Sequence, residues 1–397
     1  MPGVKPYRGV LTGFNEAFLV DTPTRDRLVA ADPASAEIIK PYLRGQDVQR
    51  WSAPYGGLHM ILLKSSSDFA WPWADTPDET AAESVFAKTY PALHARMKRY
   101  ESLPGDKPNQ VKGLRHRQDH GRFWWELRPC AYYDAFERPK TSYQEIQFYP
   151  SYSADLNGRY GNNKTFFIPN TELYLLAVLN SPLLWWHNWR FLPHMKDEAL
   201  TPVAFRMELL PIASGSAEAK DTISADVDRL IAVSANLRAT TTAIHDWLRL
   251  EFGLDLPGRL LERPERLDAD GFASAVRAAL PRRRQLSAAE IARLKREHVQ
   301  TGSPAREAAA EALRLERRLS DLVNAAYGLT PEDVALMWSS APPRMPVRRA
   351  SSRVISLVNA IGRAGTSEML VRSCHQNRRS SPATETRSTV WGRISGP

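Results

Sequence analysis

The spacing of hydrophobic and polar positions changes twice along the chain. In residues 1–215, short apolar runs rich in aromatic side chains alternate with Gly, Pro, Asn and Ser, which is typical of short strands, turns and brief helices. In residues 216–340, apolar side chains recur every three or four positions among Ala, Arg and Glu, which predicts long helices. Residues 341–397 are rich in Ser, Arg and Pro and contain few apolar side chains, which indicates disorder. The pattern predicts an α+β protein with a mixed, strand-rich domain over 1–215, a helical domain over 216–340 and a disordered basic tail over 341–397.

Turn and capping residues locate several elements within these regions. Asn157-Gly158 separates two aromatic-rich runs, so we expect a tight β-hairpin there. Ser303-Pro304 has the chemistry of a helix start, and a long helix is expected from it to Gly328. Further helix starts are marked by Ser181 before Pro182, Ser287 with Glu290, and Thr330 with Asp333.

The stretch 121–146, GRFWWELRPCAYYDAFERPKTSYQEI, combines seven aromatic side chains with four cations. Large rings contribute most of the apolar area that a folded core buries. We therefore expect Trp124, Trp125, Tyr133 and Phe136 to lie mainly in the core, and the cations to lie at the edges of this aromatic ridge.

The net charge of +9 is concentrated at one end of the chain. Ten arginines and two glutamates give residues 341–397 a formal charge of +8, so residues 1–340 are almost neutral. A folded body of this charge has to bind a polyanion through a local patch.

The two cysteines, the lack of a secretory start and the lack of an apolar segment long enough for a bilayer predict a cytoplasmic protein without membrane association.

The sequence contains none of the common catalytic motifs. It has no GxGxxG, no GxxxxGK[ST] and no GxSxG, and we interpret Gly9 and Gly13 as turn glycines. His116 and His120 lie in a polar loop without an evident third ligand, so no metal site is predicted. We assign no catalytic residue and expect no enzymatic activity from this chain alone.

Polar and aromatic side chains lie on or beside predicted strands and turns over 128–164. Arg and Lys suit phosphates and guanine edges, Asn suits adenine, and aromatic rings stack on bases. A plain solvated surface remains the alternative for each cation. The candidate DNA-binding residues are Lys140, Arg159, Lys164, Asn162, Asn163, Arg128 and Tyr143. Among them, Lys140, Arg159 and Lys164 are expected to form one DNA-facing patch across the hairpin.

Several segments resemble, in the expected order, the TaqI-like C-terminal specificity domain of adenine-specific DNA methyltransferases and type IIG restriction-modification enzymes. They are YRGVLTGFNEAFLVD, SAEIIKPYLRGQDVQRW, WWELRPCAYYDAFERPKTSYQEI, GRYGNNKTFFIPNTELYLLAVLNSPLLWW and, in the helical part, ALPRRRQLSAAEIARLKREH and DLVNAAYGLTPEDVALMW. The resemblance covers roughly residues 7–345. It implies sequence-specific recognition of double-stranded DNA, with Lys140 at or near the DNA face.

The chain departs from this family in one respect. Family members carry a domain for S-adenosylmethionine with an Asn-Pro-Pro-Tyr/Phe motif, and neither is present here. The resemblance therefore implies S-adenosylmethionine only for a missing or partner catalytic domain. It leaves three alternatives: a recognition module, a specificity subunit that docks a methyltransferase in trans, or a nonfunctional gene remnant. The tail after Met345 does not match the family pattern and has the texture of an out-of-frame extension.

Overall fold

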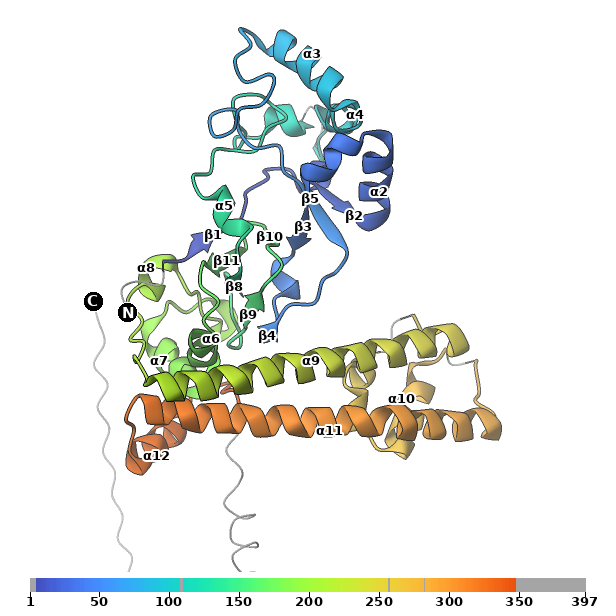
Figure 1. The fold of residues 1–397 in the computed structure, drawn as a ribbon. Helices are drawn as coiled ribbons and strands as arrows, with labels where there is room; N and C mark the ends of the chain where they lie inside the picture. Colours follow the sequence, from blue (N-terminus) through green and yellow to red (C-terminus); the bar gives the residue numbers. More distant parts are fainter. Residues whose placement is uncertain (1–4, 108–109, 256–257, 282, 348–397) are drawn as a thin grey trace, which may run out of the picture. The chain divides into compact units, whose positions relative to one another are not determined.

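A computed structural model describes residues 5–107, 110–255, 258–281 and 283–347 (Figure 1). Strand-rich and helical segments follow one another along the chain, so the predicted α+β class is confirmed. The described residues all belong to one compact unit. The division into domains at residue 216 stays a prediction. The expected disorder of the tail lies, from residue 348 onward, outside the described residues.

A five-stranded sheet occupies the middle of the strand-rich region. The strand order is β1-β11-β8-β9-β4, with antiparallel pairs except for the parallel pair β9 and β4. The strands are β1 (Tyr7–Arg8), β4 (Trp51–Ser52), β8 (Lys140–Gln144), β9 (Tyr152–Asp155) and β11 (Thr165–Ile168). Strand β8 is central, and all but its last residue are buried.

A second sheet has four strands in the order β10-β3-β5-β2. Its strands are β2 (Leu19–Asp21), β3 (Ile39–Leu43), β5 (Leu58–Ile61) and β10 (Tyr160–Gly161), and a separate small pair joins β6 (Leu103–Pro104) to β7 (Val111–Lys112). The helices of this part are α1 (Asn15–Phe18), α2 (Thr22–Ala31), α3 (Glu79–Thr89), α4 (Pro91–Arg99) and α5 (Tyr133–Phe136).

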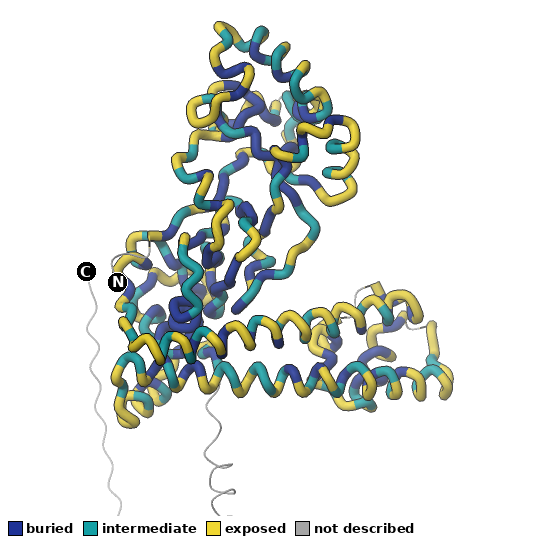
Figure 2. Tube along the Cα trace, viewed as in Figure 1, coloured by how far each residue is buried: buried dark blue, intermediate teal, exposed yellow. Residues whose placement is uncertain are grey.

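The aromatic ridge of residues 121–146 forms part of the core, as predicted. Trp124, Trp125, Tyr133 and Phe136 are all buried. Buried stretches run through the whole strand-rich region (Figure 2). The Trp125 ring stacks on Phe123 at a centroid distance of 5.0 Å, and Phe136 stacks on Tyr160 at 4.8 Å. Burial of these rings stabilises the fold far more than any surface contact of the ridge.

The predicted hairpin at Asn157-Gly158 is wrong, although the turn itself is present. Gly158 has φ +63°, in the left-handed region that glycine adopts without steric cost. The flanking strands do not pair with each other. Both edges of β9 are already occupied, by β8 and β4, and β10 pairs in parallel with β3 of the other sheet.

Two short helices and a single turn follow the sheets. They are α6 (Leu173–Asn180), α7 (Pro182–Phe191) and α8 (Ala204–Met207). Ser181 caps α7 as predicted, since its Oγ accepts a hydrogen bond from Leu184 N at 3.1 Å. Helix α6 is apolar on all sides and nearly all of it is buried against β9 and the helical region.

The helical region contains α9 (Ala217–Phe252), α10 (Ala269–Ala279), α11 (Ala288–Ala326) and α12 (Pro331–Ser339). Helices α9 and α11 pack along each other (Figure 1). The capping boxes at Ser287 and Thr330 are confirmed. The predicted helix start at Ser303-Pro304 is wrong, because α11 runs through Pro304. Its neighbours Gly302 and Ala305 are buried, so tertiary packing offsets the local cost of proline inside a helix.

Candidate nucleic-acid interface

The predicted DNA-binding residues separate into a buried group and an exposed group. Lys140, Arg159 and Tyr143 are only 1 %, 4 % and 0 % exposed. The expectation that Lys140 and Arg159 face solvent beside Lys164 is therefore wrong.

Lys140 and Arg159 are held inside the protein by one carboxylate. Lys140 Nζ lies 2.9 Å from Asp155 Oδ2, and Arg159 Nε lies 3.0 Å from Asp155 Oδ1. Both cations also donate to backbone oxygens. Lys140 Nζ donates to Phe136 O at 2.6 Å, and Arg159 Nη1 donates to Ala53 O at 2.9 Å. Burial lowers the pKa of Lys140, against the opposing effect of Asp155. These hydrogen bonds join β8, β9 and the turn after β9, and they leave neither cation open to a phosphate.

Tyr143 is likewise a core residue. Its ring stacks on Phe166 with centroids 5.5 Å apart, and its hydroxyl donates to Pro202 O at 3.3 Å. Burial raises the pKa of the phenol well above its ordinary value. The side chain has no free face on which a base can stack.

Lys164 is exposed, and the structure brings it together with a residue that sequence reasoning missed. Arg8 Nη2 and Lys164 Nζ both reach Glu145, at 2.8 Å and 2.7 Å. The side chains of Arg8 and Lys164 are 49 % and 62 % exposed, whereas that of Glu145 is 20 % exposed. Arg8, Glu145, Asn162, Asn163 and Lys164 are called the β1–β11 edge below. Two cations share one anion there, so the edge carries a local positive charge.

Gly9 positions Arg8 at this edge. A Cβ at Gly9 would lie 2.0 Å from Asn162 O, and Gly9 N donates to Thr165 O at 2.8 Å. Only glycine permits this approach of two backbones. Gly9 is therefore a close-approach glycine, not the turn glycine that we expected, whereas Gly13 has φ +66° and does lie in a turn. The glycine directly after Arg8 is the sequence feature that could have indicated it.

The two asparagines shape the loop before β11. Asn162 Oδ1 accepts from Lys164 N at 3.1 Å, and Asn163 O accepts from Arg8 Nε at 2.8 Å. Both residues are partly buried. The oxygen of Asn162 is thus used by the turn, and its amide NH2 faces no partner among the described residues.

Arg128 is exposed but pairs with a different anion. Its Nη1 lies 3.4 Å from Asp119 Oδ1, and its side chain is 53 % exposed. An exposed pair of this length contributes little to stability. Arg128 remains available to a ligand, outside the β1–β11 edge.

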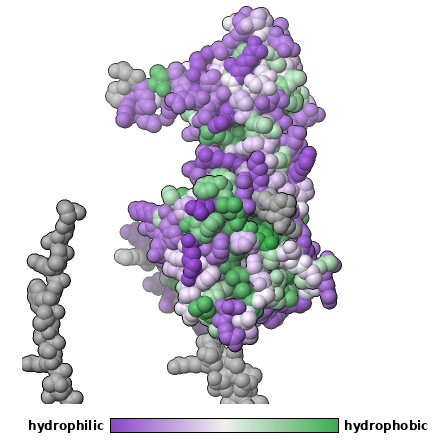
Figure 3. Space-filling view, turned by 90° about the vertical axis from the view of Figure 1, so that its left-hand side faces the viewer, coloured by the Kyte–Doolittle hydropathy of each residue, from purple (hydrophilic) through white to green (hydrophobic). Residues whose placement is uncertain are grey.

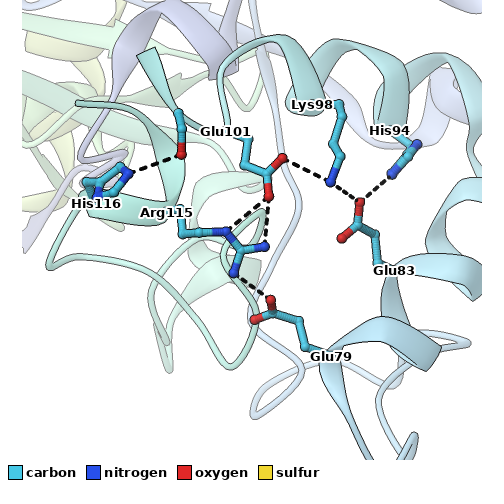
Figure 4. A network of polar contacts seen from close by, with 8 residues as sticks. Glu79, Glu83, His94, Lys98, Glu101, Arg115 and His116 are labelled. Atoms are coloured by element: carbon cyan, nitrogen blue, oxygen red, sulfur yellow. Dashed lines mark hydrogen bonds and ion pairs between the residues drawn. The ribbon is translucent and has the colours of Figure 1, made fainter. Parts of the chain in front are cut away.

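The polar cluster of α3, α4 and the turn at Leu114–His116 contains three carboxylates, two cations and two histidines (Figure 4). Lys98 Nζ lies 2.6 Å from Glu83 and 2.9 Å from Glu101, and Arg115 pairs with Glu101 and Glu79. His116 contacts Ser102 Oγ at 3.1 Å. Across the described ranges, no group of His, Cys, Asp and Glu has the geometry of a metal site. The ion pairs of Lys98 and Arg115 connect α3, α4 and the turn at Leu114–His116, so this cluster is a structural brace between these elements.

Comparisons with known proteins identify no established family for the whole chain. Residues 216–323 match the model of a domain of unknown function, DUF8810. No curated protein matches. A solved structure of the type IIL restriction-modification enzyme MmeI in complex with DNA is similar at 11 % identity and a TM-score of 0.43, over 86 % of this chain and 35 % of that chain. The chain thus spans about a third of the length of that enzyme. Within the described part of the protein, no helix is long and apolar enough to cross a bilayer.

Proposed function

We propose that this chain recognises duplex DNA sequence-specifically, as the target-recognition module of an adenine-specific DNA methyltransferase or a type IIG restriction-modification system. The ordered segment resemblance over residues 7–345 supports this class. The observation that carries the proposal is the β1–β11 edge, where Arg8 and Lys164 are exposed and share the single carboxylate of Glu145. The body is otherwise nearly neutral, so such a local excess of positive charge suits a phosphate track.

In this proposal each side chain has a limited task. Arg8 and Lys164 fix the register of the protein on backbone phosphates, which carries no sequence information by itself. The amides of Asn162 and Asn163 hydrogen-bond to base edges in the major groove, where Asn suits adenine. The adenine is flipped and methylated by a companion domain, which also binds S-adenosylmethionine.

The test measures duplex binding by fluorescence anisotropy at several salt concentrations, with the full chain throughout so that the basic tail contributes equally to every variant. Arg8→Gln and Lys164→Gln should each weaken binding and reduce the slope of log K against log salt by about one unit. Glu145→Gln should tighten binding, because it removes the anion that competes with phosphate. Lys88→Gln is the matched control, since Lys88 is exposed on α3 and forms no ion pair within the described residues. If the three edge variants bind as the parent does, the edge is not the DNA site.

A second candidate function is a specificity subunit that docks a methyltransferase in trans. It is favoured by exposed large apolar side chains in and beside α8, since Phe205 and Leu209 are 62 % and 66 % exposed; Met195, in the segment between α7 and α8, is 49 % exposed. Figure 3 shows patches of apolar surface on the face in view, next to polar surface. Apolar side chains grouped in this way are typical of a protein contact.

The test of this second function mixes the chain with a separately encoded adenine methyltransferase that lacks a recognition domain, and measures complex mass. Leu209→Ser should weaken the complex. Leu250→Ser, at a 78 % exposed position of α9, should leave the complex unchanged. Equal loss in both variants, or no complex with the parent, contradicts the docking function.

A further inference from the structure

A hollow of about 270 Å³ lies between α2 and α4. None of the residues that line it belongs to the β1–β11 edge. The two helices pack against each other (Figure 1). The residues that line the hollow are Thr24, Arg27, Leu28, Ala92, Ala95, Arg96 and Arg99. Three of them are arginines and none is acidic.

Arg96 is the fixed member of this set. Its Nε donates to Ala17 O at 2.8 Å and its Nη2 donates to Glu16 O at 2.7 Å, so the guanidinium ties α4 to the end of α1. These carbonyls orient the group but do not neutralise its charge. Burial lowers the pKa of Arg96, and neighbouring Arg99 acts in the same direction. Tyr100 and the carboxylate of Asp21 act in the opposite direction on this pKa, but burial outweighs them.

The other two arginines retain most of their hydrogen-bonding capacity. Arg27 donates from Nη2 to Thr24 Oγ1 at 2.9 Å, and both Arg27 and Arg99 are exposed. Within the described residues, none of the three guanidinium groups forms an ion pair. The nearby carboxylate of Asp21 already accepts from Thr24 N as the N-cap of α2. Several N–H donors thus remain unused around one hollow.

The helix dipole does not explain all three arginines around the hollow. Arg99 lies in the last turn of α4, where a cation is favoured by the helix dipole. The dipole does not account for Arg27, which comes from another helix, nor for the absence of an acidic lining. The guanidinium fork matches the oxygens of phosphate and carboxylate groups, and three cations around one hollow favour the more highly charged phosphate.

We propose that the hollow between α2 and α4 binds a phosphate group through Arg27, Arg96 and Arg99. The phosphate belongs either to a DNA backbone or to a soluble phosphorylated compound. This inference does not depend on the proposed function, because free phosphate is a sufficient probe.

The first experiment follows thermal unfolding of the full chain in sodium phosphate and in sodium chloride of equal ionic strength and pH. A bound anion stabilises the folded state, so the parent should gain about 2 °C or more in Tm. Phosphate also stabilises proteins by general exclusion from their surface, and this part should appear equally in all variants. The double variant Arg27→Gln/Arg99→Gln should retain only the increase in Tm that comes from general exclusion of phosphate. The matched control is Arg138→Gln, because Arg138 is exposed and forms no ion pair among the described residues.

Equal gains in the parent, the double variant and the control overturn the proposal. If the double variant does not fold, the single variant Arg99→Gln, at an exposed position, replaces it with the same criterion. Phosphorus NMR titration of inorganic phosphate should in addition show line broadening with the parent and not with the variant.

The second experiment identifies the source of the phosphate. Duplex DNA affinity is measured against salt for the parent and for Arg27→Gln/Arg99→Gln. A slope reduced by about one unit or more assigns the hollow to a DNA backbone contact. An unchanged slope, together with a lost phosphate effect on Tm, assigns it to a soluble phosphorylated compound. Loss of binding in the Arg8 and Lys164 variants alone would concern the β1–β11 edge and not this hollow.

Discussion

Lys140 Nζ lies 2.9 Å from Asp155 Oδ2, and the two side chains are 2 % and 0 % exposed. Asp155 also pairs with Arg159, so one buried anion serves two buried cations. Removal of the shared anion leaves both cations without a partner, whereas removal of Lys140 leaves a one-to-one pair.

The first prediction follows from this asymmetry. Asp155→Asn should reduce the free energy of unfolding by about 3–5 kcal/mol, because it leaves uncompensated buried charge. Lys140→Met should cost clearly less, about 1–3 kcal/mol. Urea unfolding followed by circular dichroism measures both values. A loss for Lys140→Met that equals or exceeds the loss for Asp155→Asn contradicts the shared-anion arrangement.

The second prediction concerns pH and the brace in Figure 4. Burial raises the pKa of Glu83 and of Glu101, but hydrogen bonds and ion pairs with Lys98 outweigh it, with help from His94 and Arg115, so that both pKa values lie below the ordinary 4.5. Carboxylates with a lowered pKa stabilise the folded state above pH 4.5, and this contribution is lost as the pH falls through their folded pKa.

Lys98→Met should therefore lower stability at pH 7 by about 0.5 kcal/mol, since the Lys98 side chain is 45 % exposed and the pairs are screened. The difference from the parent should disappear on acidification below the folded pKa values of both carboxylates. Urea midpoints across the acid range measure this, with Lys88→Met as the control on α3. A difference that persists undiminished in acid would falsify the electrostatic explanation.

The third prediction concerns the close approach at Gly9. Gly9→Ala places a Cβ 2.0 Å from Asn162 O, so strand β1 or the loop before β11 has to move. We expect a loss of about 1–3 kcal/mol and faster amide hydrogen exchange in β1. Gly45→Ala is the matched control, because its nearest neighbour would lie at 3.5 Å, and it should be close to neutral. Similar behaviour of the two variants contradicts the role of Gly9.

The fourth prediction concerns the contact between β4 and α11. Glu316 Oε1 accepts from Arg50 Nε and from Trp51 Nε1, each at 2.6 Å. Trp51 has φ +75°, an unfavourable conformation for a large side chain that costs of order 1–3 kcal/mol and persists only where contacts hold it.

Glu316→Gln should reduce stability by about 3 kcal/mol, because it leaves the charge of Arg50 nearly buried and unpaired. A double-mutant cycle with Arg50→Met should give a coupling of about 0.5–3 kcal/mol. Additive effects of the two substitutions would show that Arg50 and Glu316 do not act together. Arg229→Met is a suitable control, since its pair with Glu311 is exposed.

The sequence by itself determined the fold class, the burial of the aromatic ridge and several helix starts. Trp124 and Trp125 are buried because rings of this size gain most from leaving water, wherever the chain places them. Ser181, Ser287 and Thr330 cap helices because the capping hydrogen bond spans only three residues and needs no distant partner.

Only the tertiary structure decided which cations are exposed and which strands pair. Lys140 and Arg159 look like surface charges in the sequence, and they are buried because β8 and β9 bring Asp155 between them. Arg8 joins Lys164 at one edge because Gly9 lets β1 approach the loop before β11, across more than 150 residues. Helix α11 continues through Pro304 because packing along α9 offsets a local penalty. In each case a contact between residues far apart in the chain outweighed the local preference, and such contacts are not encoded in any short stretch of sequence.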